Sequence, residues 1–304
     1  MSPQSQQSAA APHMHVDRSE TRPTVARVTL QRPFLKWAGA KTKLVAAIRD
    51  VAPSQAKRFI EPFAGSGAVG LNLGLPNNIL ADANRDLIDV YRELKRDGEK
   101  FIEECAKLFT HANNAADTFY LLREEFNTTA DRRRKAGLFI YFNRHGYNGL
   151  CRYNSSGGFN VPFGRYDAPY FPRAEMHRFH EFLKTCSLRS SDFREVLTQA
   201  GEDDFVYCDP PYVPASKTAN FTAYSKGGFS PKDQLELAEM CHEASRRGAH
   251  VVISNHDTPE TRQLYGEADE CIKLLVSRRI SCDGDNRVKA KELLVVYRPA
   301  GILT

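Results

Sequence analysis

Segments predicted to be short strands alternate along the chain with longer segments whose apolar residues recur at helical spacing. The predicted strands are 58–63, 78–83, 187–191, 204–208, 250–255, 271–280 and 292–297. Helices are predicted at 42–51, 86–126, 138–143 and 231–247. Thr42 is a possible cap of the first helix, and Ser230 and Asp233 have the spacing of a capping box at the last. Strands that alternate with helices are typical of an open α/β sheet.

The stretch Asp209-Pro210-Pro211-Tyr212 directly follows the apolar run 204–208. Proline has no N–H group and cannot continue a strand ladder, so Asp209 and Tyr212 should lie at the carboxyl end of a strand. In open α/β sheets ligands bind at that end. The Asp209 carboxylate, the Pro210 carbonyl and the Tyr212 ring together suit a planar amine, such as the exocyclic amino group of a nucleobase. The alternative is a turn that only ends the strand, with Asp209 as a cap and Tyr212 packed.

A glycine-rich loop follows the first predicted strand. Gly65, Gly67 and Gly70 have the spacing G-x-G-x-x-G between a strand and a helix, where glycines permit a tight turn and the close approach of a ligand. Asp82 ends the next predicted strand about 20 residues past the first, the spacing at which an acid reaches the ribose hydroxyls of a nucleotide. The loop therefore predicts a crevice for an adenosine-bearing ligand.

The ordered chain is expected to begin at 33–43, because residues 1–31 are rich in Ser, Gln, Ala and Pro without periodicity and predict a disordered tail. Phe34, Leu35 and Trp37 form an apolar cluster there, beside a glycine turn and lysines. Trp37, the single tryptophan, either stacks on an adenine ring or anchors the core. The sequence leaves both interpretations open.

Residues 143–165 are crowded with Gly, Asn, Arg and Tyr. Gly157-Gly158 predicts a hairpin turn between two short strands. A loop and hairpin of this composition can offer bidentate contacts to base edges together with aromatic stacking. Long polar loops are also predicted at 213–229, directly after the proline turn, and at 281–291.

Positive charge is concentrated in one part of the chain. The net charge is +5, and residues 121–190 carry twelve Lys and Arg against six Asp and Glu, so the rest is close to neutral. Localised positive charge is typical of a protein with a polyanionic partner. A solvated basic face is the alternative. The run Arg132-Arg133-Arg134-Lys135 is interpreted either as a solvated helix end or as a set of phosphate contacts.

Composition excludes several classes of protein. A chain of 304 residues, 41% hydrophobic, suits one large soluble domain, with or without a substantial insertion. We predict no membrane span and no secretory signal, since no apolar run has the necessary length. Seven cysteines without CxxC spacing predict reduced thiols in a cytosolic protein. A zinc site would need clustered Cys and His ligands, and because the sequence shows no such cluster, we predict no metal site.

Taken together, these motifs resemble the DNA adenine N6-methyltransferases of the Dam type, the D12 class in the alpha group of amino-methyltransferases. The resemblance covers residues 33–299. Its motifs are FLKWAGAK at 34–41, EPFAGSG at 61–67, ADAN at 81–84, NRHGYNGLCRYN at 143–154, FNVPFGRY at 159–166, DPPY at 209–212, TANFTAY at 218–224 and ISNHDT at 253–258. Their order is cofactor loop, recognition segment and DPPY.

The resemblance implies a fold and a set of ligands. The fold is a Rossmann-like class I methyltransferase sheet dependent on S-adenosylmethionine (SAM). Residues 32–85 and 187–304 would form the SAM-binding catalytic domain, and 86–186 an inserted helical and β-hairpin domain for DNA recognition. The implied partner is double-stranded DNA and the implied product of SAM is S-adenosylhomocysteine, with no metal. A monomer is expected, cytoplasmic and either nucleoid-associated or phage-encoded.

The resemblance also implies roles for individual residues. The catalytic residues would be Asp209, Pro210 and Tyr212. The cofactor contacts would be Trp37, Lys41, Glu61, Phe63, Gly65, Asp82 and Asp209. The DNA contacts would be Lys36, Tyr147, Asn148, Leu150, Arg152, Arg165 and Tyr166.

The expected reaction is methylation of a flipped adenine, with GATC as the family site. Asp209 and the Pro210 carbonyl would accept the two N6 hydrogens while Tyr212 stacks on the base. Asp167 departs from the family, where lysine is frequent, and this departure bears on how the first base is read. The alternatives are an N4-cytosine methyltransferase, where Ser usually replaces Asp209, a glutamine-side-chain methyltransferase, where Asn is usual, and a non-catalytic DNA-binding protein.

Overall fold

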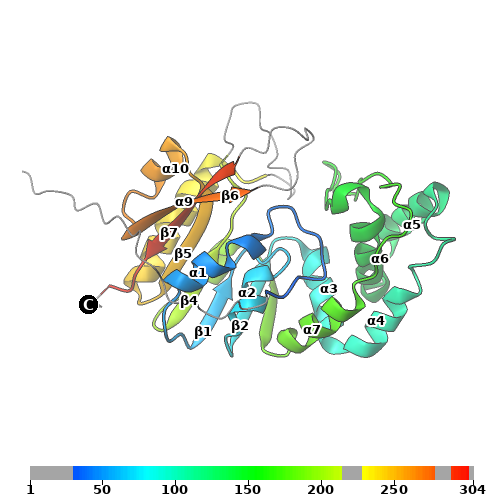
Figure 1. The fold of residues 1–304 in the computed structure, drawn as a ribbon, viewed down its shortest axis with the longest axis horizontal. Helices are drawn as coiled ribbons and strands as arrows, with labels where there is room; N and C mark the ends of the chain where they lie inside the picture. Colours follow the sequence, from blue (N-terminus) through cyan, green and yellow to red (C-terminus); the bar gives the residue numbers. More distant parts are fainter. Residues whose placement is uncertain (1–29, 214–227, 278–288, 301–304) are drawn as a thin grey trace, which may run out of the picture.

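The computed structural model describes residues 30–213, 228–277 and 289–300 (Figure 1). The predicted tail except its last two residues, nearly all of the loop 213–229 and most of the loop 281–291 lie outside these residues. The ordered chain reaches back to Gln31, whose N–H donates to Asn72 Oδ1 at 2.8 Å and whose carbonyl accepts from Asn72 Nδ2 at 3.0 Å.

One seven-stranded sheet, in the order β3-β2-β1-β4-β5-β7-β6, forms the centre of the described chain (Figure 1). Its strands are β1 (Arg58–Glu61), β2 (Asn78–Asp82), β3 (Cys186–Ser190), β4 (Asp204–Cys208), β5 (His250–His256), β6 (Glu270–Ser277) and β7 (Lys289–Tyr297). β7 runs antiparallel between β5 and β6, and the first five strands of the order are parallel. The prediction of a Rossmann-like methyltransferase sheet is confirmed.

Alternate residues of the central strands face two separate apolar clusters. Phe205 and Tyr207 of β4 pack with the helices α1 (Val45–Val51) and α2 (Ala68–Leu73). Val206 and Cys208 face the other side. That side is covered by α8 (Phe193–Leu197), α9 (Pro231–Arg246) and the end of α10 (Pro259–Leu264). Burial on both faces explains why β4 appears in the sequence as a continuous apolar run.

Besides the 3₁₀ turn η2 (Tyr147–Gly149), the chain between β2 and β3 forms five α-helices, which make up one side of the molecule (Figure 1). They are α3 (Arg85–Arg96), α4 (Gly98–Ala106), α5 (Ala116–Thr128), α6 (Arg132–His145) and α7 (Arg173–Leu183). The stretch predicted as helical over 86–126 is therefore three helices. The first break falls at Asp97, whose φ of −153° is not helical. An aromatic-rich cluster that includes Tyr91, Phe142 and Phe179 joins these helices to the sheet.

The predicted hairpin around Gly157 is confirmed as a turn but not as a pair of strands. Asn154 N–H donates to the Gly158 carbonyl, and Gly157 N–H donates to the Asn154 carbonyl, both at 2.9 Å. Only the isolated bridges Tyr153–Phe159 and Gly146–Phe163 flank it. Side chains of α5 also hold this segment: Asn127 Nδ2 donates to the Phe159 carbonyl at 3.2 Å, and Arg123 Nη1 donates to the Val161 carbonyl at 3.1 Å.

Two helix starts were predicted, with different outcomes. The capping box of α9 is confirmed, because Asp233 N–H donates to Ser230 Oγ and Ser230 N–H donates to Asp233 Oδ2. Thr42 was wrong as a cap, because a 3₁₀ turn, η1 (Lys41–Lys43), comes first and Leu44 is the N-cap residue of α1.

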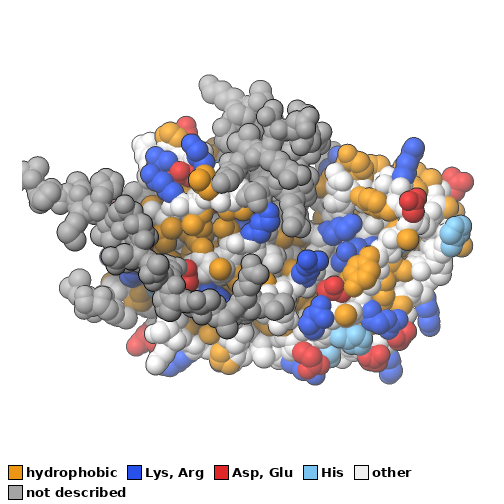
Figure 2. Space-filling view, in the orientation of Figure 1, with side chains coloured by type: hydrophobic (Ala, Val, Ile, Leu, Met, Phe, Trp, Pro, Cys, Tyr) orange, Lys and Arg blue, Asp and Glu red, His pale blue; other side chains and the backbone are white. Residues whose placement is uncertain are grey.

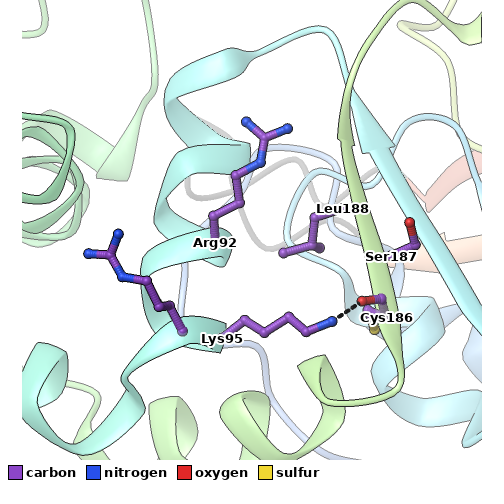
Figure 3. Close-up of a pocket in the computed structure, with 6 residues that line it drawn as sticks. Arg92, Lys95, Cys186, Ser187 and Leu188 are labelled. Carbon is purple, nitrogen blue, oxygen red and sulfur yellow. Dashed lines mark hydrogen bonds between the residues drawn. The ribbon is translucent and has the colours of Figure 1, made fainter.

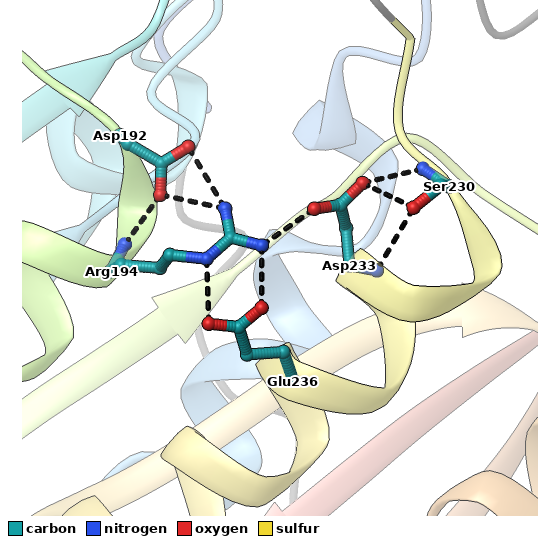
Figure 4. Close-up of polar contacts among 5 residues, drawn as sticks. All are labelled: Asp192, Arg194, Ser230, Asp233 and Glu236. Carbon is teal, nitrogen blue, oxygen red and sulfur yellow. Dashed lines mark hydrogen bonds and ion pairs between the residues drawn. The ribbon is translucent and has the colours of Figure 1, made fainter.

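An ion-pair network fixes the start of α9 against α8 (Figure 4). The guanidinium of Arg194 bonds to Asp192 at 3.0 Å, Asp233 at 2.5 Å and Glu236 at 2.7 Å. The bonds from Ser230 and then from Arg194 lower the pKa of Asp233 to about 2. None of the described helices combines the length and apolar character needed to cross a membrane.

Candidate active site

Three carboxyl groups meet where the strand order reverses, between β1 and β4. Glu61 is the last residue of β1, Asp82 the last of β2, and Asp209 directly follows β4. Burial raises the pKa of each, and the charges of Asp209 and Asp82 raise that of Glu61 further. The reversal point of a doubly wound sheet is where ligands bind. The structure thus brings these predicted site residues together.

The glycine loop lies in the same place and is shaped by positive φ angles at Gly65 (+46°) and Gly67 (+66°). A Cβ at Gly65 would lie 2.7 Å from Trp37 Nε1, so the indole lies directly on the loop. Gly65 N–H donates to Asp82 Oδ2 at 3.0 Å, and the Tyr91 hydroxyl donates to the Gly65 carbonyl. Trp37 is half-buried against the core as well. Both interpretations of Trp37 therefore have a structural basis.

Asp209 is bonded through one oxygen. Lys41 Nζ lies 3.0 Å from Asp209 Oδ1, and Ser254 Oγ donates to the same oxygen at 2.9 Å. The Tyr207 hydroxyl in turn donates to Ser254 Oγ at 2.9 Å, which fixes the serine. Within the described chain, Asp209 Oδ2 has no hydrogen-bond partner. The oriented carboxylate thus keeps one oxygen available as an acceptor.

The proline turn is held from both sides. Gln234 Nε2 donates to the Pro211 carbonyl at 2.6 Å, and Val213 N–H donates to Asn255 Oδ1 at 3.2 Å. Asn255 is fully buried and also donates to Gln234 Oε1 at 3.3 Å. Among the described residues nothing donates to the Pro210 carbonyl. It remains an acceptor near Asp209, as the sequence predicted.

Three contacts fix the Tyr212 ring. Its hydroxyl donates to Glu292 Oε2 at 2.7 Å, and its ring meets the His256 imidazole edge-on at 4.7 Å and 81°. Lys41 Nζ lies 4.5 Å from the ring centroid. Burial raises the pKa of the Tyr212 hydroxyl well above its usual range, and Asp209 and Glu292 raise it further, so the phenol stays neutral.

Sequence reasoning missed Ser254, Gln234, Asn255 and Glu292. Ser254 and Asn255 lie in the motif at 253–258, which marked the segment without assigning them roles. Glu292 was seen only as part of a closing strand. It lies opposite His256 in the β5–β7 pairing, which brings it to Tyr212.

A buried acceptor near the loop fits a cationic ligand group. Glu61 is 2% exposed, and its Oε2 has no partner among the described residues.

Phe63, also predicted to contact the cofactor, stacks on Phe193 with ring centroids 5.5 Å apart and an angle of 27° between the rings, and it is half-buried. Within the described residues, no group of three or more His, Cys, Asp and Glu is arranged to hold a metal ion.

The predicted DNA contacts lie in the segment after α6 and in the chain that enters η1. Lys36, Tyr147, Asn148, Arg152 and Arg165 are exposed, whereas Leu150 and Tyr166 are half-buried. Lys36 Nζ lies 5.0 Å from the Tyr166 ring, and Asn148 N–H donates to the Tyr166 hydroxyl at 2.9 Å. Lys36, Asn148 and Tyr166 are therefore one cluster.

Two asparagines join this segment to the cofactor loops. Asn143 of α6 is buried; its Nδ2 donates to the Lys36 carbonyl at 2.7 Å and its Oδ1 accepts from Lys36 N–H at 2.8 Å. Asn84, which caps α3 two residues after Asp82, also donates to Cys151 Sγ at 3.4 Å. Hydrogen bonds thus join the segment after α6 to the chain around Trp37 and to the end of β2.

The basic run at the start of α6 is mostly paired with acidic side chains. Arg133 Nε lies 2.6 Å from Glu104, Arg134 Nε 2.6 Å from Glu125, and Lys135 Nζ 3.1 Å from Asp86. Figure 2 shows Lys and Arg side chains over the helical side of the molecule with carboxylates between them. The interpretation of this run as phosphate contacts is therefore not supported for these three residues, which tie α6 to α3, α4 and α5.

A separate open cavity of about 450 Å³ lies between α3 and the edge strand β3 (Figure 3). It is lined by Arg92, Lys95, Arg96, Cys186, Ser187 and Leu188. Lys95 Nζ donates to the Cys186 carbonyl there. None of the predicted site residues lines it.

Comparison with known proteins gives one family. A model of the family described as "D12 class N6 adenine-specific DNA methyltransferase" matches residues 37–278. A DNA adenine methylase of Salmonella typhi is 45% identical over 273 residues, 90% of this chain and 97% of the relative. A DNA adenine methylase of Serratia marcescens is 47% identical over 269 residues, which are 88% of this chain and 98% of the relative. A solved putative methyltransferase in complex with SAH has a TM-score of only 0.38 and 13% identity, over 87% of this chain and 54% of its own.

Proposed function

The chain belongs to the family of D12 class N6 adenine-specific DNA methyltransferases, and from that premise we propose that it methylates N6 of the adenine in double-stranded GATC sites. Its methyl donor is S-adenosylmethionine. The observation that carries the proposal is the set of groups after β4: a fixed Asp209 carboxylate, a Pro210 carbonyl that no described residue bonds to, and the Tyr212 ring.

The cofactor crevice is assigned to the glycine loop and the three carboxyl groups. The turn at Gly65 and Gly67 shapes the loop beside Asp82. Glu61 Oε2, which has no partner among the described residues, suits the amino group of the cofactor's methionine part. Trp37 and Phe63 present aromatic faces, and Asp82 keeps lone pairs for ribose hydroxyls besides its two backbone bonds. The bound cofactor supplies an electrophilic methyl group.

The reaction follows from what the chain's own groups do to the target amine. A flipped adenine stacks on Tyr212, which recovers part of the cost of unstacking. Asp209 Oδ2 and the Pro210 carbonyl accept the two N6 hydrogens, so the nitrogen lone pair leaves conjugation and points at the methyl group. Positioning supplies most of the catalysis. The N–C bond would form as the S–C bond breaks, which leaves S-adenosylhomocysteine, and the extra proton on N6 would then pass to water.

Recognition of the duplex is assigned to the segment after α6. Lys36, Tyr147, Asn148, Leu150, Arg152, Arg165 and Tyr166 contact DNA in this proposal, and their exposure or clustering supports it. The same proposal includes the division into 32–85 with 187–304 and the insertion 86–186, a monomer, and a cytoplasmic location with the nucleoid or with phage DNA.

The test is methylome sequencing of a methylation-free host that expresses the protein, with mass spectrometry of the nucleosides. N6-methyladenine in GATC is the expected product. N4-methylcytosine would overturn the proposal in favour of the cytosine-specific alternative, although Asp209 argues against that reaction. Methylation of adenine in another sequence would support the reaction but reject GATC as the site. Asp167→Lys would then be the first variant to test.

Cofactor binding should be reported by the only tryptophan. Trp37 lies on the Gly65 turn and is half-buried, so titration with S-adenosylmethionine should change its fluorescence saturably. Calorimetry gives the dissociation constant for comparison. A spectrum that does not change while calorimetry shows binding would make Trp37 a core residue only.

Arg152 should read one guanine. Its Nε donates to Asn160 Oδ1 at 2.9 Å and its Nη2 to the Asn160 carbonyl at 3.2 Å. This holds one side of the exposed guanidinium, and its other donors have no partner among the described residues. Because a bidentate arginine–guanine contact discriminates by about 1–3 kcal/mol, Arg152→Ala should lower kcat/KM on GATC and relax preference at one guanine.

The measurement is kcat/KM on GATC and on every single-base variant at fixed salt. Asn160→Ala should give a weaker effect in the same direction, because it only releases the side chain of Arg152. Equal loss on all substrates, together with a lower salt dependence, would make Arg152 a phosphate contact. The residue that contacts the guanine base would then be sought among Leu150, Arg165 and Tyr166.

A further inference from the structure

The ammonium group of Lys41 lies where the proposed function needs the target amine. Lys41 Nζ is 3.0 Å from Asp209 Oδ1, a hydrogen-bonding distance, and 4.5 Å from the centroid of the Tyr212 ring. Its third partner is the Gly39 carbonyl at 2.6 Å. The nitrogen of one side chain therefore makes both kinds of contact that an N6 amine and its purine would make.

These contacts occupy space that a base needs. A purine stacked on Tyr212 requires a ring face, and the His256 edge and the Glu292 bond fix how that ring is turned. A cation centred over the ring cannot remain there when a purine stacks on the same face, although its contact with Asp209 Oδ1 leaves Oδ2 for the exocyclic amine. The aliphatic side chain of Lys41 is long and flexible, and the residue lies in a short 3₁₀ turn. The ammonium group can therefore move while the backbone keeps its position.

We propose that Lys41 is a placeholder for the target base, which holds Asp209 and Tyr212 in their working geometry and must be displaced when the adenine enters. This inference rests on the proposed function and adds a step to it. The flipping equilibrium then includes the loss of one ion pair and one cation–π interaction, both partly buried.

The charges around the site explain why a cation is kept there. Asp209 faces Glu61 from β1 and Glu292 from β7, with the hydroxyls of Tyr207, Ser254 and Tyr212 around it. Burial raises the pKa of Asp209, Glu292 adds to this, and Lys41 and Ser254 oppose it. Lys41 thus keeps the acceptor ionised until the base replaces it.

The experiment compares flipping in the wild type and Lys41→Met, which keeps the length of the stem and removes the charge. The probe is a GATC duplex with 2-aminopurine at the target adenine, with S-adenosylhomocysteine at saturation as shown by calorimetry. We expect the flipping equilibrium constant to rise by about 5- to 30-fold, the factor that corresponds to removing one weak ion pair together with one cation–π interaction. Lys41→Arg should flip like the wild type, since it keeps a cation. Lys43→Met, two residues away, is the matched control.

A double variant tests the route of the effect. If the carboxylate holds Lys41 over the ring, Lys41→Met in an Asp209→Ala background should change flipping by far less than it does alone. The acidic limb of kcat/KM should also move to higher pH in Lys41→Met, because removing the cation raises the pKa of Asp209 in the free enzyme. The acidic limb of kcat, which reports the complex from which Lys41 has been displaced, should stay where it is. A placeholder predicts these effects together.

Flipping that stays the same or falls in Lys41→Met at saturating cofactor would overturn the inference and leave Lys41 a cofactor contact only. The wild type's methylation of adenine, measured in the same preparation by mass spectrometry, tests the proposed function separately. Its absence would remove the premise, whereas its presence with unchanged flipping rejects the placeholder alone.

Discussion

Asp209→Ala is expected to abolish nearly all methyl transfer while the protein stays folded. The carboxylate is only 20% exposed and is aimed by Lys41 and Ser254. Removing one preorganised hydrogen-bonding group from a transition state costs about 10²–10³ in kcat, and Asp209 also aligns the amine, so we expect a loss of about 10³-fold or more. Single-turnover methylation at saturating cofactor and DNA measures this step directly.

Two matched variants separate chemistry from folding. Asp209→Asn keeps one acceptor oxygen but not the charge, and it should fall between the wild type and Asp209→Ala. Glu202→Ala removes an exposed carboxylate just before the other end of β4 and should leave turnover unchanged. Thermal melting of the three variants shows whether each of them is still folded. Turnover near the wild-type level in a folded Asp209→Ala variant would reject the assigned mechanism.

Features with local signals were predicted well from the sequence. The run 204–208 coincides with β4, and the α9 capping box was placed correctly, because its bonds join residues three apart. The glycine loop was also recognised, because the positive φ angles at its positions 65 and 67 favour glycine, and these glycines are visible in the sequence. Thr42 failed because the 3₁₀ turn at Lys41–Lys43 delays the helix, and its residue types do not announce it.

Features that depend on pairing between distant segments were not predicted. Ser254 reaches Asp209 across the β4–β5 pair, and Glu292 reaches Tyr212 through the antiparallel register of β7, which no single strand encodes. The basic run at 132–135 was open to the same error. Its partners lie on helices whose packing the sequence did not specify, so a structural set of ion pairs looked like a surface for phosphates.

The site and the recognition segment are connected through the same few residues. Asn143 holds the backbone of Lys36, one residue before the tryptophan that lies on the glycine loop. Four residues further on, η1 begins with Lys41, which contacts both Asp209 and Tyr212. The proposed DNA contacts and Lys41, the group that we propose the base displaces, are thus anchored on one short stretch of chain.

Tyr212→Ala should lose about 10²- to 10⁴-fold in kcat while the duplex still binds, since base stacking is worth about 1–3 kcal/mol and a misplaced base adds to the loss. Tyr212→Phe keeps the ring but leaves the Glu292 carboxylate, 7% exposed, without its hydroxyl partner. It should retain stacking and lose only about tenfold, the size of a hydrogen bond to a charged group. The measurements are kcat and KM, with 2-aminopurine fluorescence for flipping.

Glu292→Gln completes the argument, because it keeps an oxygen acceptor for the Tyr212 hydroxyl and removes the charge near Asp209. If Glu292 acts by holding the ring, its effect should largely disappear in a Tyr212→Phe background, where there is no hydroxyl to hold. Additive losses in the double variant would show that Glu292 acts on Asp209 through its charge instead. Normal kcat in Tyr212→Ala would mean that the flipped base stacks elsewhere and that the aromatic residue of DPPY serves only to end the strand.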